Sequence, residues 1–333
     1  MKILVTGGTG FIGSHTVVEL LDQNHEVIVI DNFSNSKPDV VEKIREITGK
    51  DFIFYQGDVC DKSLLEKVFK DNRIDAVIHF AGYKAVGESV QKPLMYYRNN
   101  IDSTLSLCEI MGQYDCKNLV FSSSATVYGN PASLPIKEDF PLSTTNPYGS
   151  TKLYIEGILK DLHRSDNNWN IAVLRYFNPI GAHESGLIGE NPNDIPNNLM
   201  PYIVKVATKE LDYLNVFGND YNTNDGTGVR DYIHVVDLAL AHIKAIEKIT
   251  TENSGIDFYN LGTGNGYSVL ELVTTFSKVN NIDVPYQITD RRPGDIDACY
   301  ADPAYAFKEL NWKATKGIEE MCRDAYNFVN KNK

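Results

Sequence analysis

A tyrosine, a lysine and a serine in this chain have the types and spacing that proton transfer requires. Tyr148 and Lys152 are four residues apart, and Pro147 suits the first turn of a helix, so both side chains should share one helical face. A phenol has an ordinary pKa of about 10, too high for a base near neutral pH. A lysine ammonium one turn away is expected to lower that pKa, and the Ser124 hydroxyl can pass or hold the proton. We predict that Ser124, Tyr148 and Lys152 form a proton-transfer set.

The tyrosine–lysine spacing also has an ordinary structural interpretation. In a chain with 19 tyrosines, about one such pair is expected by chance, and Tyr148 with Lys152 is the pair found. The catalytic interpretation therefore depends on a dinucleotide site elsewhere in the chain.

The first 31 residues predict such a site. An apolar run at 2–6 leads into glycines at Gly7, Gly10 and Gly13, and a helical pattern follows at 14–23. Glycines with this spacing let the backbone turn tightly and place a pyrophosphate at the helix N-terminus. Asp31 ends the next predicted strand, 18 residues after Gly13, close to the spacing at which an acidic side chain binds ribose hydroxyls. A carboxylate there would repel a 2′-phosphate, so NAD is favoured over NADP. The alternative is a glycine-rich turn beside a helix-capping acid.

Strands and helices alternate through the first half of the chain. Apolar runs predict strands at 26–30, 52–56, 74–80, 118–122 and 170–176, with helices at 39–48, 62–70, 93–111 and 148–162 between them. This alternation predicts an α/β fold, a Rossmann-type doubly wound parallel sheet. Such a sheet binds its ligand at the carboxyl ends of the strands. Residues at two of those ends are expected near the adenine (Asp58, Val59) and along the path to the nicotinamide (Phe80, Ala81, Gly82, Lys84).

After Tyr176 the alternation gives way to segments rich in Gly, Pro and Asn. We therefore expect a dinucleotide domain at 1–179 and a smaller mixed α/β substrate domain at 180–333, with some segments returning to the sheet. Helical patterns in the second half are predicted at 199–208, 235–248 and 269–279. Arg230 and Arg292 could grip phosphate oxygens with their planar forks, and Asp295 could accept from ribose hydroxyls. The alternative for these loop residues is ordinary surface exposure.

Composition narrows the class of protein. A net charge of −12 and a pI near 5.1 argue against a nucleic-acid partner or an anionic membrane surface. No apolar run reaches the length of about 18 residues that a membrane span needs, and the N-terminus lacks a signal-peptide pattern. The five cysteines are scattered without a paired spacing, so neither a metal site nor a disulfide framework is expected. These features indicate a cytoplasmic protein.

Several longer sequence motifs in this chain resemble those of a known protein family. The glycine loop, Ser124 and the Tyr148/Lys152 pair resemble the extended short-chain dehydrogenase/reductase family. More specific phrases are similar to those of the UDP-glucose (UDP-galactose) 4-epimerase family, from the first residues to about Trp312. They read HFAG at 79–82, KAVGES at 84–89, SSSATVYG at 122–129, RYFNP at 175–179, IPNNLMPY at 195–202 and GVRDYIH at 228–234.

The resemblance implies site residues beyond those the spacing indicates. The NAD-binding residues it implies are Gly7, Gly10, Phe11, Ile12, Gly13, Asp31, Asn32, Asn35, Ser36, Asp58, Val59, Phe80, Ala81, Gly82, Lys84, Asn99, Ser122, Tyr148, Lys152, Tyr176 and Phe177. The residues it implies for a UDP-hexose are Lys84, Ser124, Tyr148, Asn178, Asn198, Leu199, Asn215, Val216, Phe217, Arg230, Arg292, Asp295 and Cys299.

The implied reaction is reversible 4-epimerisation of UDP-glucose and UDP-galactose through a 4-keto sugar. Tyr148 would take the 4-hydroxyl proton through Ser124, while NAD accepts the C4 hydride and later returns it to the other face. NAD would therefore stay bound as a prosthetic group. A 4,6-dehydratase or decarboxylase on the same scaffold would need an acidic residue just after Ser124, where this chain has Ala125 and Thr126. A non-catalytic NAD sensor would be expected to lack the Tyr148/Lys152 pair.

Two further expectations follow from the resemblance. Cys299 aligns with a position in the hexose pocket, where a tyrosine restricts the family to unmodified hexoses and a small residue admits N-acetylated ones, so UDP-GlcNAc and UDP-GalNAc should also be substrates. The alternative is that Cys299 is an inconsequential small residue and Tyr300 fills the space. A homodimer should form through the helices at 93–111 and 148–162, which carry apolar residues on more than one face: Leu105, Leu107, Ile110, Met111, Ile155, Ile158, Leu159 and Leu162.

Overall fold

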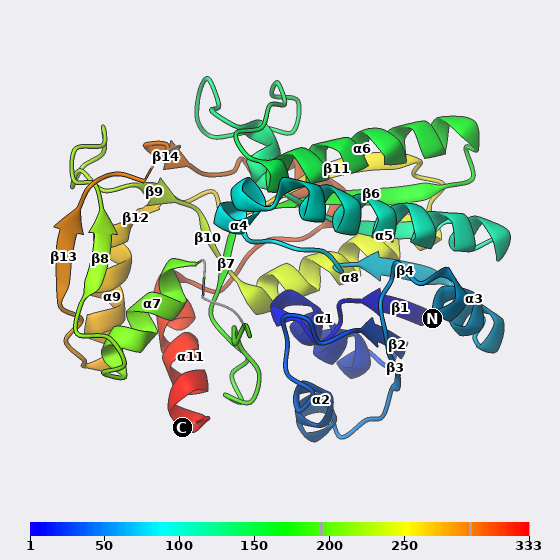
Figure 1. Cartoon of the computed structure of the whole chain (residues 1–333), viewed down its shortest axis with the longest axis horizontal. Coiled ribbons are helices and arrows are strands. Elements are labelled where there is room, and N and C mark those ends of the chain that lie inside the picture. Colours follow the sequence, from blue (N-terminus) through cyan, green and yellow to red (C-terminus); the bar gives the residue numbers. More distant parts are fainter. Residues whose placement is uncertain (194–195, 197, 293–294, 333) are drawn as a thin grey trace.

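The computed structural model describes residues 1–193, 196, 198–292 and 295–332. Within these residues the largest sheet has seven strands, all parallel, in the order β11-β6-β5-β4-β1-β2-β3 (Figure 1). Their bounds are β1 Lys2–Thr6, β2 Glu26–Asp31, β3 Ile53–Gln56, β4 Ala76–His79, β5 Asn118–Ser124, β6 Asn170–Tyr176 and β11 Ile256–Leu261. The predicted Rossmann-type doubly wound α/β fold is confirmed.

Helices cover both faces of this sheet, which explains why its central strands are continuously apolar. One face packs against α1, α2 and α8, and the other packs against α3, α5 and α6. The bounds are α1 Phe11–Asp22, α2 Val40–Thr48, α3 Lys62–Asp71, α5 Pro93–Gln113, α6 Pro147–Ser165 and α8 Val235–Thr251. Leu4 and Val5 of β1 contribute to opposite cores, and both are fully buried. The predicted elements of this half match the observed ones to within a few residues at each end.

Two elements of this core come from the second half of the chain. Helix α8 packs along α1, and β11 pairs with β6 as the last strand of the sheet. No strand was predicted at β11, whose apolar run is interrupted by Asp257 and Asn260.

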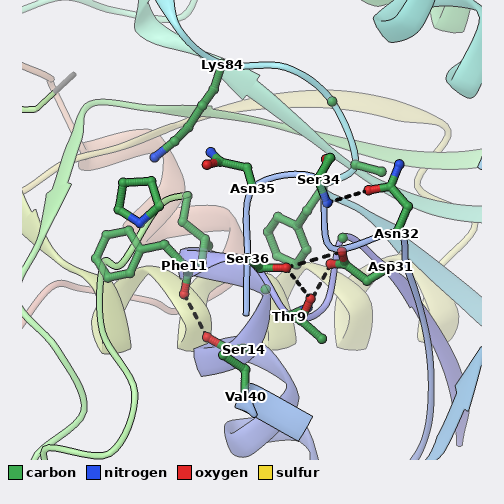
Figure 2. A pocket seen from close by; sticks show the side chains of 18 of the residues that line it. Thr9, Phe11, Ser14, Asp31, Asn32, Ser34, Asn35, Ser36, Val40 and Lys84 are labelled. Atoms are coloured by element: carbon green, nitrogen blue, oxygen red, sulfur yellow. Dashed lines mark hydrogen bonds between the residues drawn. The ribbon is translucent and has the colours of Figure 1, made fainter. Parts of the chain in front are cut away.

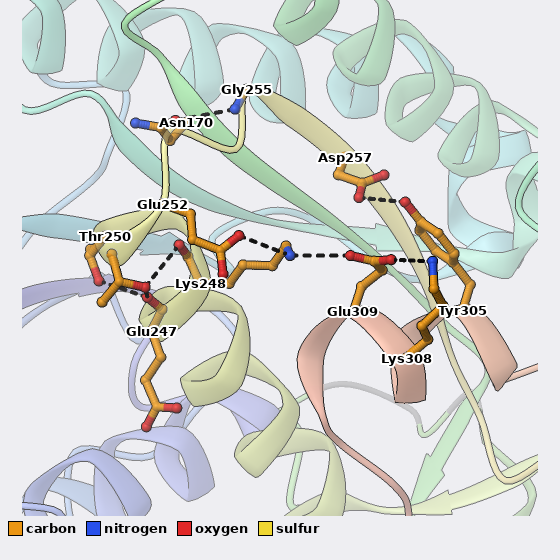
Figure 3. A network of polar contacts seen from close by, with 11 residues as sticks. Asn170, Glu247, Lys248, Thr250, Glu252, Gly255, Asp257, Tyr305, Lys308 and Glu309 are labelled. Carbon is orange, nitrogen blue, oxygen red and sulfur yellow. Dashed lines mark hydrogen bonds and ion pairs between the residues drawn. The ribbon is translucent and has the colours of Figure 1, made fainter.

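Helix α10 (Ala304–Leu310) packs beside β11, on the face of the sheet that α8 also covers (Figure 3). The Tyr305 hydroxyl donates to Asp257 at 2.8 Å, and Lys248 of α8 pairs with Glu309 at 3.3 Å. These contacts hold α10 against β11 and α8.

The remaining elements form a smaller part at the left of Figure 1, around a core of its own. Helices α9 and α11 pack against each other there, and short strand pairs surround them: β7 with β10, β8 with β13, and β9 between β12 and β14. The bounds are β7 Asn178–Ile180, β8 Leu214–Phe217, β9 Val229–Arg230, β10 Tyr232–His234, β12 Tyr267–Ser268, β13 Tyr286–Thr289, β14 Ala298–Cys299, α7 Leu199–Ala207, α9 Val269–Asn280 and α11 Ile318–Lys331. Two short helices complete the described elements, α4 (Val86–Gln91) and the 3₁₀ turn η1 (Ala125–Tyr128). In the part of the chain that the structure describes, no helix combines the length and apolar character needed to cross a membrane.

Candidate active site

The glycine loop after β1 leaves the N-terminus of α1 open. Gly7 has a φ of +71°, which favours glycine, and a Cβ on Gly13 would lie 2.2 Å from the Gly7 carbonyl oxygen. Helix α1, described throughout, begins after Gly10 with neither a side-chain cap nor an acidic residue in its first turn. Its free N–H groups and the positive end of its dipole are therefore available to an anion, and a dinucleotide pyrophosphate fits this cradle.

Asp31 is fixed at the end of β2, next to that loop. Its carboxylate accepts from the backbone N–H of Thr9 at 3.0 Å and from that of Phe33 at 2.8 Å. The Ser36 hydroxyl lies 3.4 Å from the same carboxylate and 2.7 Å from the Thr9 hydroxyl (Figure 2). The side chain thus has one held orientation, as recognition of a ribose diol requires.

These groups line one cavity, which we call the glycine-loop cavity. The NAD-binding residues predicted from the sequence that line it are Gly7, Gly10, Phe11, Ile12, Gly13, Asp31, Asn32, Asn35, Ser36, Asp58, Val59, Phe80, Ala81, Gly82, Lys84, Asn99, Ser122, Tyr148, Lys152 and Tyr176. Phe177 is the exception, because it is buried against Val127, Tyr128 and Ile136 and lines no described cavity. Lys84 projects into the end of the cavity away from Asp31 (Figure 2).

Of the three residues predicted to transfer protons, Tyr148 and Lys152 line this cavity, and Ser124 lies beside Tyr148. Helix α6 begins at Pro147 with Asn146 as its cap, which places Tyr148 in the first turn. The Ser124 hydroxyl is close enough to Tyr148 to lower the pKa of that phenol, and it accepts from the Thr126 hydroxyl at 3.0 Å. The Lys152 ammonium donates to the carbonyl of Ser122 at 2.6 Å. Tyr148 therefore has both Ser124 and Lys152 as close neighbours.

The expected depression of the Tyr148 pKa is wrong for this structure. Burial raises the pKa of Tyr148, and the hydrogen bond from Ser124 only partly opposes it. The Lys152 ammonium lies 5.9 Å from the centroid of the Tyr148 ring and points at Ser122. Burial also lowers the pKa of Lys152 from 10.5 to about 8, against the carboxylate of Glu156. Loss of water around each group is the largest cause of both pKa shifts.

A buried ionic network, not predicted from the sequence, lies next to Ser124 and Lys152. Glu156 of α6 accepts from Arg175 of β6 at 2.7 and 3.0 Å and from the Ser123 hydroxyl at 2.6 Å. Arg175 also donates to the Tyr128 hydroxyl at 2.8 Å. The exposed fraction of the Glu156 and Arg175 side chains is 1% and 2%, so the pair is held within the protein. It fixes α6 against β5 and β6 beside Ser124 and Lys152. The sequence offers one signal, a charged residue inside an apolar strand.

Asn100 on α5 holds the loop after β4 in place through hydrogen bonds of its side chain. Its side chain accepts from the Tyr83 N–H at 2.8 Å and donates to the Tyr83 carbonyl at 3.0 Å. It also donates to the Thr151 hydroxyl on α6 at 3.1 Å. The loop that contains Gly82 and Lys84 is thereby fastened to the helix that carries Tyr148. An asparagine within a predicted helix gave no sequence signal for this role.

A second cavity, the arginine cavity, lies in the smaller part. The predicted UDP-hexose residues that line it are Asn178, Asn198, Leu199, Asn215, Val216, Phe217, Arg230, Arg292 and Asp295. Arg230 and Arg292 both approach Asp295, at 3.6 and 2.9 Å, and the Arg292 guanidinium lies 5.1 Å from the centroid of the Phe217 ring. Arginines beside a flat aromatic ring suit a nucleoside diphosphate.

Cys299 itself lines neither of the two cavities. It pairs in register with Arg230 and packs, partly buried, near Val127 and Phe177. Burial raises the pKa of Cys299 to about 11, so its thiol is neutral. Tyr300 packs against Gly266. Ile195 and Asn197 of the phrase at 195–202, and Gly294 before Asp295, lie outside the described residues.

Glu190, absent from the predicted set, connects the two cavities. It lines the glycine-loop cavity and pairs with Lys84 at 3.1 Å. The same carboxylate oxygen accepts from Asn198, which lines the arginine cavity, at 2.7 Å.

A glycine loop, a strand-end aspartate and a tyrosine–lysine pair in a doubly wound sheet define an NAD-binding enzyme of the short-chain dehydrogenase/reductase class. The model of the family described as GDP-mannose 4,6 dehydratase matches residues 4–325. UDP-glucose 4-epimerase of Bacillus subtilis (strain 168) is 60% identical over 332 residues, covering 100% of this chain and 98% of that relative.

Solved structures agree. The UDP-glucose 4-epimerase of Bifidobacterium longum, in complex with NAD+ and UDP, is 55% identical with a TM-score of 0.96, covering 100% of this chain and 99% of that one. The UDP-Glc/GlcNAc 4-epimerase of Campylobacter jejuni is 33% identical with a TM-score of 0.86, covering 99% of each chain. The chain belongs to the UDP-glucose 4-epimerase family.

Proposed function

We propose that this protein interconverts UDP-glucose and UDP-galactose by NAD-dependent 4-epimerisation. The observation that carries the proposal is the Tyr148–Ser124 contact at a glycine-loop cavity that Glu190 joins to the arginine cavity. This arrangement places a proton acceptor between a dinucleotide site and a nucleoside diphosphate site. The full-length similarity to UDP-glucose 4-epimerases supports the same reaction.

The glycine-loop cavity suits NAD. The N-terminus of α1 would hold the pyrophosphate and Asp31 a ribose diol, while Lys152 would hold the second ribose. When bound, NAD supplies an acceptor for the C4 hydride and a donor for its return, so net redox is zero. Asp31 and its fixed hydrogen bonds disfavour a 2′-phosphate.

Tyr148 and Ser124 would move the proton. The sugar 4-hydroxyl gives its proton to Ser124 as Ser124 passes its own to the Tyr148 phenolate, and the reverse transfer follows when the ketone is reduced. Because burial raises the Tyr148 pKa, the phenolate needs positive charge nearby. We assign that charge to Lys152, with the cationic nicotinamide ring adding to it when NAD is bound.

The arginine cavity would hold the UDP part of the substrate. Arg230 and Arg292 can each bind the diphosphate, and Asp295 can accept from the uridine ribose. Asn215, Val216 and Phe217 of β8 lie beside them and suit the uracil, while Asn178 and Asn198 are placed for the diphosphate or sugar. The keto sugar would then turn about its bonds to the held diphosphate.

Elimination is disfavoured as an alternative. Ala125 follows Ser124 in the described η1 turn, and the Thr126 hydroxyl donates to Ser124. Neither residue can act as the acid or base that a 4,6-dehydratase needs, although the matching family model is described by that activity.

A single assay tests the proposed function. Purified protein is incubated with UDP-galactose and no added NAD, and the products are separated. We expect UDP-glucose. An unsaturated or 4-keto product would indicate the dehydratase, and unchanged substrate with NAD also supplied would remove both enzymatic proposals.

Three finer proposals accompany this function. The small thiol at Cys299 would admit N-acetylated hexoses, and the Campylobacter jejuni neighbour is itself a UDP-Glc/GlcNAc 4-epimerase. A cytoplasmic location fits five free cysteines. A homodimer would form across α5 and α6.

Most of the apolar residues predicted to form the dimer contact are instead packed inside a single chain. Five of them form part of the core between the sheet and its helices: Leu107, Ile110, Met111, Ile155 and Leu159. The apolar side chains of these helices and of α4 that remain exposed are Val86, Val90, Leu94, Leu105 and Tyr154. This smaller set now supports the proposed contact.

A further inference from the structure

Three cations that line the two cavities are paired with carboxylates of the same chain. Arg230 and Arg292 face Asp295, and Lys84 faces Glu190 at 3.1 Å. A diphosphate that enters must therefore compete for these cations with charges of its own sign. The Glu190 pair stands out, because nothing in the sequence assigned Glu190 a function.

Glu190 is held between the cavities. The exposed fraction of its side chain is 10%, against 44% for Lys84. Its oxygen Oε1 accepts from the Lys84 ammonium and, at 2.7 Å, from the Asn198 amide. Lys84 lines the glycine-loop cavity and Asn198 the arginine cavity. One carboxylate oxygen thus accepts hydrogen bonds from one donor in each cavity.

The charge of Glu190 determines what it can do to a ligand. An ionised carboxylate only accepts hydrogen bonds, so Glu190 cannot donate to a phosphate oxygen. In a partly buried site its repulsion of a diphosphate is screened less than at the surface. Asn198 and Lys84 are the kinds of donor that a diphosphate binds, and Glu190 holds both.

We propose that Glu190 is a counter-ion latch for the substrate diphosphate. It satisfies Lys84 and Asn198 while the arginine cavity is empty, and it yields them when a nucleoside diphosphate enters. The latch lowers the affinity for that ligand and speeds its release, which a reversible enzyme needs for turnover. The inference rests on the proposed function, since it takes the diphosphate of a UDP-sugar as the competing anion.

The substitution Glu190→Gln tests the latch. Glutamine keeps the shape and one acceptor oxygen, so the bridge between Lys84 and Asn198 can persist while the negative charge is lost. Calorimetric titration of the NAD-containing protein with UDP should give a Kd about tenfold lower than that of wild type, with slower dissociation in stopped-flow measurements. Glu190→Ala, which removes the bridge as well, should also bind UDP more tightly.

Glu184→Gln is the matched control, because Glu184 is an exposed carboxylate on the same segment. It should leave the Kd for UDP unchanged. NAD released by acid should be equal in wild type and in Glu190→Gln, which assigns the effect to the substrate diphosphate and not to the cofactor pyrophosphate.

The outcomes separate the two proposals. If wild type binds UDP and Glu190→Gln binds it equally or more weakly, the latch is wrong and the proposed function stands. A change in NAD content without a change in the Kd for UDP would also overturn the latch. If wild type fails to bind UDP, the proposed function falls and the latch falls with it.

Discussion

At the scale of single residues, Tyr148 experiences opposing influences on its proton. Burial raises the pKa of Tyr148, whereas the Ser124 hydroxyl stabilises the phenolate. Lys152 alone does not lower the pKa of Tyr148 to its ordinary value, because its ammonium is also buried and donates to the carbonyl of Ser122. A site of this kind keeps the base protonated until positive charge arrives beside it. Binding of NAD and activation of the base would then be coupled.

Tyr148→Phe should reduce turnover at least about 100-fold, because it removes the proton acceptor and changes the volume little. UDP affinity should remain near that of wild type, since Tyr148 lines the glycine-loop cavity and not the arginine cavity. Steady-state kinetics and UDP titration on the same preparation measure both. A variant that retains more than a tenth of wild-type turnover would show that Tyr148 is not the base.

Cys299→Tyr should narrow the range of sugars. A phenol ring would fill space that the thiol leaves for an acetamido group, so kcat/KM for UDP-GlcNAc should fall at least about tenfold while that for UDP-glucose is kept. Comparison of both pairs of substrates in both proteins gives the answer. Wild type inert towards UDP-GlcNAc, or a variant that handles it equally well, would reject Cys299 as the gate.

At the scale of elements, α6 depends on a contact far from its own sequence. Glu156 binds Arg175 of β6 and Ser123 of β5, and this sets the position of the helix along the sheet. A buried ion pair is weak evidence for stability, but removal of one partner leaves the other charge uncompensated. The pair also adds a carboxylate near Lys152, which partly offsets the effect of burial on the Lys152 pKa.

Glu156→Gln should therefore change the pH dependence of the reaction. Glu156 raises the pKa of Lys152 against burial, so its loss should move that pKa below about 8. Lys152 would lose its proton at a lower pH, and the alkaline fall in kcat/KM should begin earlier than in wild type. If Glu156 had a purely structural role, the substitution would lower the stability of the protein without shifting the alkaline side of the pH profile of kcat/KM.

Asp161→Asn provides the control for Glu156→Gln, because Asp161 is an exposed carboxylate on the same helix. Its pH profile should match that of wild type. If kcat/KM falls at the same alkaline pH in wild type and in Glu156→Gln, Glu156 does not raise the pKa of Lys152 in the working enzyme.

At the scale of the whole molecule, the two parts of the chain are interwoven. Helix α8 and β11 complete the layers of the large sheet after the chain has already built β7, α7 and β8 of the smaller part. Both cavities therefore sit on a common framework, and Glu190 bridges them. The exposed apolar side chains of α4, α5 and α6 are outside this framework, where a second copy could cover them.

Leu94→Glu should convert a dimer to a monomer. Leu94 is 82% exposed on α5, and a charge there would have to be buried in the proposed contact. Light scattering across a concentration series should report the mass of two chains for wild type and of one for the variant. Phe307→Glu, at an aromatic residue 54% exposed on α10, should leave the dimer intact. A wild type that is monomeric at every concentration would remove the idea.

The sequence by itself determined the parts that local pattern controls. The glycine loop, Asp31 and the spacing of Tyr148 and Lys152 are short-range features, and runs of apolar residues predicted six of the seven strands of the large sheet. Nearly all the predicted NAD residues line one cavity because parallel strands end at one edge of a sheet.

Tertiary structure decided what depends on burial and on distant partners. Strand β11 is defined by its pairing with β6, not by its own polar-interrupted sequence. Glu156 and Glu190 acquire their partners only when segments far apart in the chain meet. The pKa of Tyr148 was predicted in the wrong direction, because helical spacing shows the neighbouring charge but not the loss of water around both groups. Desolvation is a property of the packed molecule, so no local pattern of residues records it.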